Sequence, residues 1–142
     1  MSASSPAPSV GGCQCGAVRF AVAEPPCIVY VCHCRKCRKQ SASAFGISVI
    51  VPRAALQVTQ GTPAHWSCAG DSGRIFDSAF CPTCGTRLWH AGEGNATISI
   101  KGGSLDEPPT LEDAVHIWVS RKLPGVIIPD GARQFPEEPD DD

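Results

Sequence analysis

The sequence of 142 residues has no long apolar run, little charge and few aromatic side chains. A membrane-spanning helix needs about 20 consecutive apolar residues, and no run approaches that length. Only 18% of the residues are charged and the net charge is −2, so no broad positive field is available to hold nucleic acid. The one basic cluster is local and consists of Arg35, Lys36, Arg38 and Lys39. The composition therefore predicts neither a membrane protein nor a nucleic-acid partner.

Helical periodicity is almost absent, which argues against a mainly helical domain. Only residues 35–44 look moderately helical, and a turn is expected at 52–56. The chain has 14 glycines and 13 prolines, which favour many turns between short elements. Short β-rich runs are expected to form strands at residues 18–22, 28–31, 45–51, 64–68, 74–80, 97–101 and 115–120. Short strands at this spacing predict an all-β domain.

A chain of this length has room for one hydrophobic core. Residues 1–9 are small and polar and are expected to form a disordered N-terminal tail. They lack the apolar segment of a secretory signal, which favours a reducing, cytoplasmic location. Residues 133–142 end in acidic side chains and are expected to be a solvated C-terminal tail. The folded domain is therefore predicted to span residues 10–132.

Cysteine is the residue type that is not scarce, with nine in the chain. Seven of them fall into three clusters, which are Cys13 and Cys15, then Cys32, Cys34 and Cys37, then Cys81 and Cys84. A C-x-x-C pair in a tight turn directs two sulfurs at one point, and Gly85 suits such a turn because glycine tolerates the left-handed conformation. An odd count, crowded spacings and a reducing compartment argue against disulfides. Zinc is therefore the preferred interpretation, and iron–sulfur ligation is the alternative metal.

Seven ligands make one closed four-thiolate site and leave three over. A structural zinc has four protein ligands, whereas a catalytic zinc keeps three and leaves one position open, so we expect two zinc ions with different roles. Pairing the first cluster with the last closes a long loop and leaves Cys32, Cys34 and Cys37 as a three-sulfur cup. The alternative division, the middle cluster with the last, leaves only two cysteines for the second metal. Cys27 and Cys68 lie outside the clusters and are expected to pack in the core.

Four stretches carry a resemblance to a known family: GGCQCGAVRF, VCHCRKCRKQSASAFG, SGRIFDSAFCPTCGTRLWH, and finally GGSLDEP with HIWVSRK. Together they resemble the glutathione-dependent formaldehyde-activating enzyme family, whose domain also occurs in centromere protein V. The resemblance covers about residues 10 to 131. It implies a small β-tent fold with a structural zinc on Cys13, Cys15, Cys81 and Cys84. It also implies a catalytic zinc on Cys32, Cys34 and Cys37, which matches the division preferred from ligand counting.

The family reaction joins glutathione and formaldehyde into S-hydroxymethylglutathione and is formally that of a carbon–sulfur lyase. Three thiolates on Zn²⁺ leave a local charge of −1, which makes the metal a poor generator of hydroxide. Soft ligands suit a substrate thiol at the fourth position instead, where zinc would lower its pKa and orient it. The alternative function is a zinc-stabilised binding module without chemistry. A fourth protein ligand at the middle site, from Cys27, Cys68 or His33, would favour that alternative.

Supporting residues give weaker signals. His33 could transfer a proton to the nascent hydroxymethyl oxygen, although a supporting or surface role is the simpler interpretation. Arg35, Arg38 and Ser41 are candidate contacts to glutathione, against the simpler alternatives of exposed charge and helix capping. Core packing is expected for the tryptophans, Trp66, Trp89 and Trp118. The remaining histidines, His65, His90 and His116, lack metal-like spacing and are assigned no ligand role.

Two positions depart from the family pattern. Glycine is common in the family where Ala42 stands, and a tryptophan is common after the HI-x-V-x-x-K stretch, where this chain has residues 123–126. Both differences are expected to reshape the substrate pocket.

Overall fold

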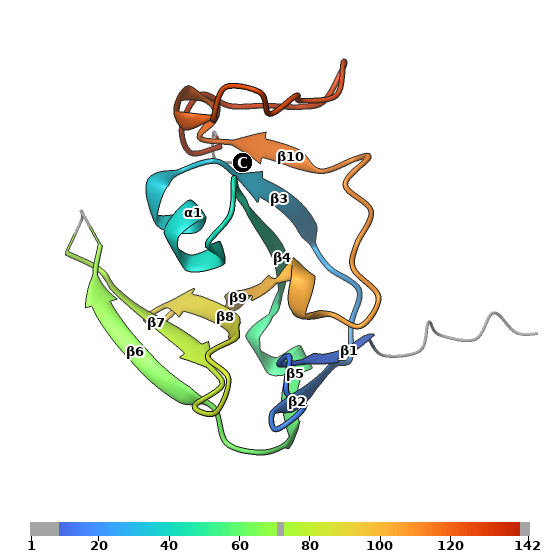
Figure 1. Ribbon diagram of the computed structural model, residues 1–142, viewed down its shortest axis with the longest axis vertical. Coiled ribbons are helices and arrows are strands. Elements are labelled where there is room, and N and C mark those ends of the chain that lie inside the picture. The colour runs from blue at the N-terminus through green and yellow to red at the C-terminus, as the bar shows by residue number, and fades with distance from the viewer. Residues whose placement is uncertain (1–8, 71–72, 140–142) are drawn as a thin grey trace, which may run out of the picture.

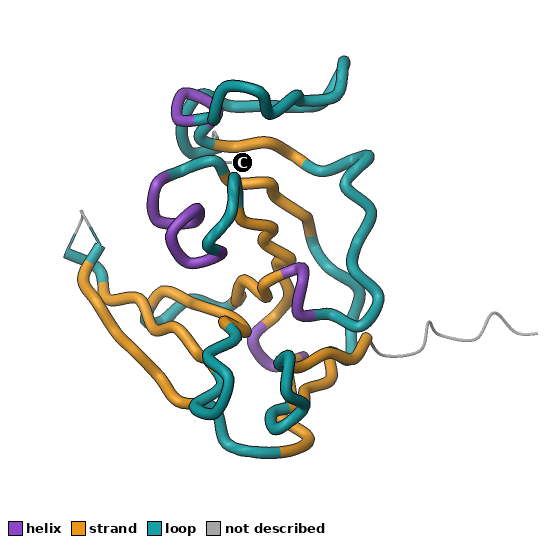
Figure 2. The backbone as a smooth tube through the Cα atoms, in the orientation of Figure 1, coloured by secondary structure: helices purple, strands orange, loops and turns teal. Residues whose placement is uncertain are grey.

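The computed structural model describes residues 9–70 and 73–139. Strand accounts for 41% and helix for 12% of the structure. The helix content is far below the average of roughly one third for globular domains, so the expected all-β class is confirmed. Figure 2 shows strands and connecting loops throughout, with helix limited to short pieces. No helix within these ranges is long and apolar enough to cross a membrane.

Ten strands form two sheets in the described part of the chain. The larger, in the order β10-β3-β4-β9-β8-β7-β6, comprises β10 (Val115–Ile117), β3 (Ile28–Cys32), β4 (Gly46–Pro52), β9 (Thr97–Lys101), β8 (Arg87–Gly92), β7 (Ile75–Phe80) and β6 (Ala64–Ala69). The smaller is β1 (Ser9–Gly12), β2 (Arg19–Val22) and β5 (Leu56–Gln60). Only β10 runs parallel to its neighbour, β3; all other pairs are antiparallel.

The larger sheet bends strongly, so that β6, β7 and β8 diverge from β3 and β4 (Figure 1). Helix α1 (Arg35–Ser41) lies within this bend and packs against β4. Three 3₁₀ turns, η1 (Arg53–Ala55), η2 (Gly102–Ser104) and η3 (Val119–Arg121), follow β4, β9 and β10. The bend therefore gives the larger sheet a concave face that holds the helix and an opposite face that meets the smaller sheet.

The main hydrophobic core fills the space between the two sheets. Alternation along the first hairpin directs Val18, Phe20 and Val22 inward, and each is at most 2% exposed. Phe20 meets Trp89 edge to face, with ring centroids 5.7 Å apart, an arrangement that aromatic rings favour. Ile100 on β9 is fully buried in the same cluster. This core supports β8 and β9 from one side and leaves their other face to the helix.

A second, smaller cluster lies between α1 and β10. It contains Cys32, Cys37, Val115 and Ile117, and Phe135 packs against it. The segment that contains Phe135 hydrogen-bonds along β10 and its continuation: the Phe135 N–H donates to the His116 carbonyl, and the Trp118 N–H to the Glu137 carbonyl. Residues 133–138 therefore lie against the domain, in contrast to the expected loose tail, because their backbone groups and Phe135 have partners there.

Most expected elements are present, and the differences have local causes. The helix ends at Ser41 because Ala42 adopts the left-handed conformation, with φ of 50° and ψ of 45°. The strand expected at 115–120 ends at Ile117 because Trp118 is also left-handed, with φ of 56°. The turn expected at 52–56 is η1. Strands β1, β5 and β8 were not expected from the sequence.

Three of the expected core positions are wrong. Cys27 is exposed just before β3, and Cys68 is only half-buried near the end of β6. Trp66 is 52% exposed because it stands on the edge strand β6, where the guanidinium of Arg87 lies 5.7 Å from its ring centroid. Trp89 is partly buried and packs against the main core, as expected. Trp118 is half-buried, and its indole N–H donates to Glu138 over 2.9 Å.

Candidate functional site

The first and last cysteine clusters meet, as expected from pairing them, and form what we call the four-cysteine site. The Sγ atoms of Cys13, Cys15, Cys81 and Cys84 all lie within 4.8 Å of one another. The Sγ of Cys15 is 3.6 Å from that of Cys13 and 3.8 Å from that of Cys81. Zn–S bonds of about 2.3 Å in a tetrahedron place neighbouring sulfurs about 3.8 Å apart. The four sulfurs therefore could bind a metal ion and fit zinc.

Two hairpin turns build the four-cysteine site. The β1–β2 turn carries Cys13 and Cys15, and the β7–β8 turn carries Cys81 and Cys84. Gly16 and Gly85 follow the second cysteine of each turn with φ of 83° and 82°, so the left-handed glycine expected at Gly85 is present. Backbone N–H groups point at the sulfurs: Val18 donates to Cys13 Sγ over 3.2 Å, and Thr83 to Cys81 Sγ over 3.3 Å. Such donors stabilise thiolates.

Thr86 joins the two turns. Its hydroxyl oxygen accepts the N–H of Gln14 over 3.1 Å and lies 3.2 Å from Cys84 Sγ, to which its hydrogen can point. This hydroxyl, together with the Thr86 backbone N–H, lowers the pKa of Cys84 to about 5. The site is thus prepared to carry negative charge, which a metal cation would neutralise.

The middle cluster forms a separate group, the three-cysteine site. Cys32 ends β3, Cys34 caps the N-terminus of α1, and Cys37 lies one turn into the helix. Their Sγ atoms lie within 4.8 Å of one another, and Cys34 Sγ accepts the N–H of Cys37 over 3.3 Å. Among the described residues, no fourth cysteine, histidine or acidic side chain joins the group. The site could therefore bind a metal through three thiolates and leave a coordination position for another ligand.

The three sulfurs act on one another electrostatically. Hydrogen bonds from the thiols of Cys32 and Cys37 lower the pKa of Cys34 to about 2. The same interactions, with burial, raise the pKa of Cys32. The Cys34 thiol is therefore deprotonated readily, while the thiols of Cys32 and Cys37 donate hydrogen bonds to it. A metal cation that binds the three sulfurs would displace the two remaining protons.

Close packing fixes Cys37. Gly46, the first residue of β4, pairs with Cys32 on β3. A Cβ at Gly46 would lie 3.1 Å from both Cys37 Cβ and Ser41 Oγ. Glycine at this position allows the helix to approach the strand so closely that Cys32 and Cys37 can share a ligand.

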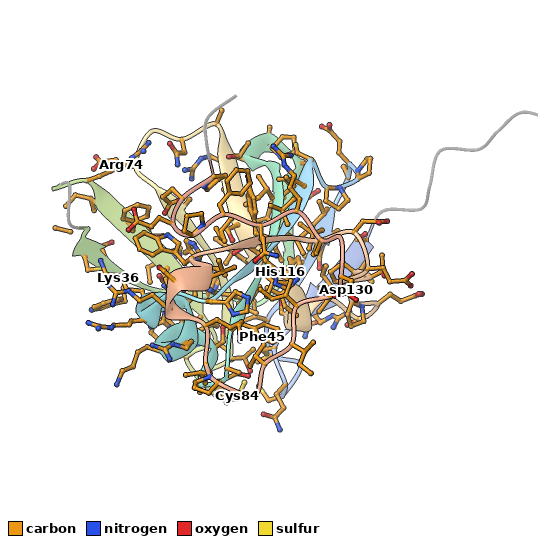
Figure 3. All side chains as sticks on the ribbon, turned by 90° about the horizontal axis from the view of Figure 1, so that it is seen from above. Lys36, Phe45, Arg74, Cys84, His116 and Asp130 are labelled. Atoms are coloured by element: carbon orange, nitrogen blue, oxygen red, sulfur yellow. The ribbon has the colours of Figure 1, made fainter. Side chains whose placement is uncertain are left out.

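His33 points away from the sulfurs, as the alternation of an extended segment requires. It is 0% exposed, its Nε2 lies 3.0 Å from His116 Nδ1, and the two rings stack with Phe45 nearby. Burial lowers the pKa of His33 to about 4, so the ring is neutral at neutral pH. Figure 3 shows Phe45 and His116 toward the middle of the molecule and Lys36 at its edge. The histidine pair thus anchors the segment between Cys32 and Cys34 to β10.

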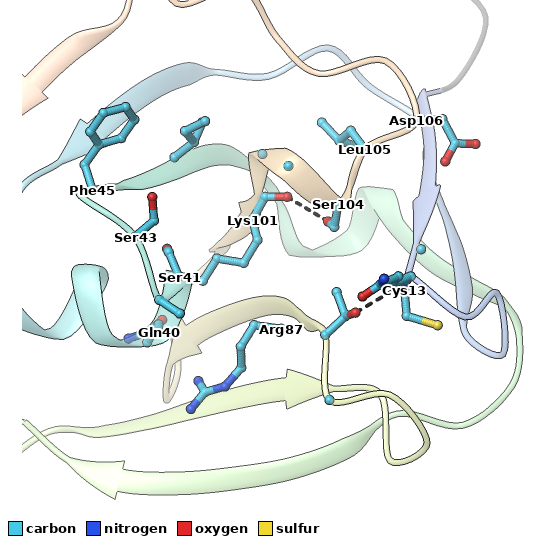
Figure 4. Close-up of a pocket in the computed structure, with 18 of the residues that line it drawn as sticks. Cys13, Gln40, Ser41, Ser43, Phe45, Arg87, Lys101, Ser104, Leu105 and Asp106 are labelled. Carbon is cyan, nitrogen blue, oxygen red and sulfur yellow. Dashed lines mark hydrogen bonds between the residues drawn. The ribbon is translucent and has the colours of Figure 1, made fainter.

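A cavity of about 780 Å³ lies beside the four-cysteine site, with Cys13 in its wall, and none of the three cysteines of the other site lines it. Its walls come from the end of α1 and the loop after it, from β8 and β9, and from the turn of the four-cysteine site; they include Gln40, Ser41, Ser43, Phe45, Arg87 and Lys101 (Figure 4). Ser41 stands four residues after Cys37, on the same face of the helix, and both lie against Gly46. The cavity therefore reaches to within one helical turn of the three-cysteine site.

The structure separates the three side chains expected to contact glutathione. Ser41 lines the cavity. Arg35 is exposed and Arg38 half-buried, and neither is part of the cavity wall. Lys101 and Arg87 do line it, and neither was expected there from the sequence. The alternation at residues 97–101 could have placed Lys101 on the polar face of β9, but that face was expected to meet solvent rather than a cavity.

Comparison with known proteins supports this description. The model of the family described as glutathione-dependent formaldehyde-activating enzyme matches residues 8–121. A protein of Rhodobacter sphaeroides with a known crystal structure is similar in fold, with a TM-score of 0.59 and 21% sequence identity. That similarity covers 75% of this chain and 98% of the other. Since the family match extends over most of the sequence and includes every clustered cysteine, the chain belongs to the glutathione-dependent formaldehyde-activating enzyme family.

Proposed function

We propose that the protein is a zinc-dependent enzyme that joins a thiol to an aldehyde, with glutathione and formaldehyde as substrates and S-hydroxymethylglutathione as product. The observation that supports this most directly is the three-cysteine site, which has three potential ligands among the described residues and lies one helical turn from a cavity wall at Ser41. Cavities of roughly 300–1,000 Å³ are typical of small-molecule sites. The family membership supports the same reaction.

Cys32, Cys34 and Cys37 would hold the catalytic zinc, and Cys13, Cys15, Cys81 and Cys84 the structural one. When bound, the catalytic zinc would supply a coordination position for the substrate thiol and lower its pKa. The net reaction forms one carbon–sulfur bond between the thiol sulfur and the formaldehyde carbon. The thiol proton ends on the hydroxymethyl oxygen, and nothing is oxidised or reduced. Most of the protein's task is therefore to position the two reactants.

The protein residues supply this positioning. Phe45 forms an apolar wall of the cavity, while Ser41 and Ser43 offer hydroxyl groups to the substrate backbone. His33 is held by His116, so its main contribution is to fix the backbone between two metal ligands. A direct proton transfer by His33 remains a prediction. The variant His33→Gln would test it: a role in proton transfer changes the pH profile of kcat, whereas a positioning role lowers zinc retention at the three-cysteine site instead.

The central test compares wild type with Cys34→Ser. Glutathione and formaldehyde react reversibly, so exchange between free and hydroxymethylated glutathione can be followed by NMR. We expect wild type to accelerate this exchange and to bind glutathione, and Cys34→Ser to do neither while it keeps its fold. Cys27→Ser is the matched control because Cys27 is exposed and belongs to neither site. Equal glutathione binding by wild type and Cys34→Ser, or no acceleration by the zinc-loaded wild type, would refute the proposal.

A further inference from the structure

Lys101 is a buried cation whose ammonium has no hydrogen-bond partner among the described residues. Its side chain is 7% exposed, and within residues 9–70 and 73–139 its Nζ makes no hydrogen bond. Burial lowers the pKa of Lys101, since a charge removed from water is costly unless it is paired. The thiolates of the three-cysteine site, Cys37 first, act in the opposite direction and raise this pKa, but none of them accepts a hydrogen bond from Nζ. An anion in the cavity would supply the acceptor that Nζ lacks.

Arg87 adds a second cation to the same cavity. Its Nη1 is buried and also lacks a hydrogen-bond partner among the described residues. The positive charge of Arg87 contributes to lowering the pKa of Lys101, so the two groups lie close enough to repel each other. An anion between them would remove this repulsion and provide acceptors for both.

The carboxylate in the cavity wall already has a partner. Asp106 lies on the cavity wall, but its carboxylate accepts from the Arg19 guanidinium, with Nη1 to Oδ1 at 3.0 Å. The hydroxyl of Ser104 donates to the Lys101 carbonyl and leaves the ammonium free. Among the described residues, the cavity wall therefore has two cationic groups, at Lys101 and Arg87, with buried nitrogens that lack a hydrogen-bond acceptor.

We propose that Lys101 and Arg87 form a subsite that binds a carboxylate of the substrate handled at the three-cysteine site. The inference rests on the proposed function, and it names the substrate class as carboxylate-bearing. The carboxylate can belong to the thiol, as in glutathione, or to the second reactant, as in a 2-oxo acid. Ser41 connects the subsite to Cys37 along one turn of α1, so one small molecule can reach both.

The test uses Lys101→Met, which keeps the length of the side chain and removes its charge. Lys39→Met is the matched control, because Lys39 is exposed on α1 and does not line the cavity. Binding of glutathione and of its diethyl ester is measured by calorimetry on zinc-loaded protein. We expect Lys101→Met to weaken glutathione binding at least about tenfold and to leave ester binding unchanged, since a charged hydrogen bond is lost only for the free acid. We expect Lys39→Met to bind both as wild type does.

A second arm identifies the source of the carboxylate. Addition of glyoxylate and of formaldehyde to the neutral thiol 2-mercaptoethanol is followed by NMR. If the aldehyde carries the carboxylate, Lys101→Met slows the reaction with glyoxylate but not the reaction with formaldehyde. The substitution then has no effect on the binding of glutathione or of its ester. Arg87→Gln is expected to give the same pattern with a smaller effect. No carboxylate-specific loss in either arm overturns the proposal.

Two further measurements separate this proposal from the proposed function. The zinc content of Lys101→Met shows whether Lys101 merely balances the charge of the thiolates. If the variant loses zinc, and if the binding of glutathione and of its ester weakens equally, the proposed carboxylate subsite is wrong. Binding of S-methylglutathione, which has no free thiol, does not require a thiol site. If catalysis is absent but S-methylglutathione still binds through Lys101, the subsite stands and the enzymatic proposal fails.

Discussion

The two cysteine sites differ in how the chain brings their ligands together. The four-cysteine site joins two turns that are distant in sequence, since Cys15 and Cys81 are 66 residues apart. Two of its cysteines, Cys15 and Cys84, are exposed. The three-cysteine site is local, and Cys32 and Cys37 are at most 9% exposed. A metal that closes a long loop restricts the unfolded chain, whereas a metal held within six residues restricts it little. The comparison is consistent with the roles we propose, a structural one for the first site and a chemical one for the second.

The largest effect is expected from Cys81→Ser. Cys81 is fully buried and receives N–H groups from Thr83 and Cys84, so its loss opens the four-cysteine site. Structural zinc contributes on the order of 10 kcal/mol to the folding of small metal-binding domains. We expect loss of cooperative thermal unfolding, measured by circular dichroism, and no retained zinc. Cys27→Ser should melt as wild type does. A Cys81→Ser protein that folds with two zinc ions would reverse the roles assigned to the two sites.

Gly46→Ala should act on the other side of the comparison. The added methyl group would meet Cys37 Cβ and Ser41 Oγ at 3.1 Å and push the helix away from β4. Overpacking of this kind costs roughly 1–3 kcal/mol, and it would separate Cys37 from Cys32. We expect zinc content to fall from two toward one per chain, with the fold retained. Gly103→Ala is the control because a Cβ there meets nothing within 4 Å. Unchanged zinc stoichiometry in Gly46→Ala would show that the close approach is not required.

The difference between the sites also explains what the sequence could predict. Ligand counts and spacing favoured pairing Cys13 and Cys15 with Cys81 and Cys84 over the alternative division, because zinc chemistry allows few divisions of seven thiols. The left-handed glycine after Cys84 followed from the same reasoning. Strands such as 97–101 were visible because alternation is written directly in the sequence.

Other features depend on tertiary contacts and could not be read in this way. Strand β5 pairs with β2 through residues such as Gln57 and Gln60, which have little strand propensity of their own. Trp66 was expected in the core, but β6 proved to be an edge strand. The partner of His33 is 83 residues away. The cation pair at Lys101 arises only when β8 and β9 bring Arg87 beside it in the folded sheet.

A smaller effect is expected from pH through His90, which is a member of neither cysteine site. Burial lowers the pKa of His90 to about 4, below its ordinary value of 6.5. As the pH falls below 6.5, His90 takes up a proton in the unfolded chain but not in the native protein. The stability of the native state therefore decreases between about pH 6.5 and 4. Up to about 2 kcal/mol should be lost between pH 7.5 and 5.

His90→Gln should remove this part of the pH dependence. The free energy of unfolding is measured with urea at pH 7.5 and pH 5 for wild type and for His90→Gln. Acid also releases zinc, but this affects both proteins, so the difference between them reports on His90. An identical loss of stability in wild type and His90→Gln would mean that the acid sensitivity belongs to the cysteine sites alone.

The smallest effect is expected from Ala42→Gly, at the end of the helix that carries Cys34 and Cys37. Ala42 has φ of 50° and ψ of 45°, and its N–H caps the carbonyls of Arg38 and Lys39. A residue with a Cβ is strained by about 1–2 kcal/mol in this conformation, while glycine is not. Glycine also loses more entropy on folding, so we expect a net stabilisation of about 0.5–1 kcal/mol, seen as a rise of a few degrees in Tm. Ala44→Gly is the control in the same loop: its φ is not positive, so it should destabilise the protein instead. Because the stabilisation arises at α1, we expect tighter zinc retention at the three-cysteine site and no change at the four-cysteine site. An equal change at both sites would show that they are energetically coupled.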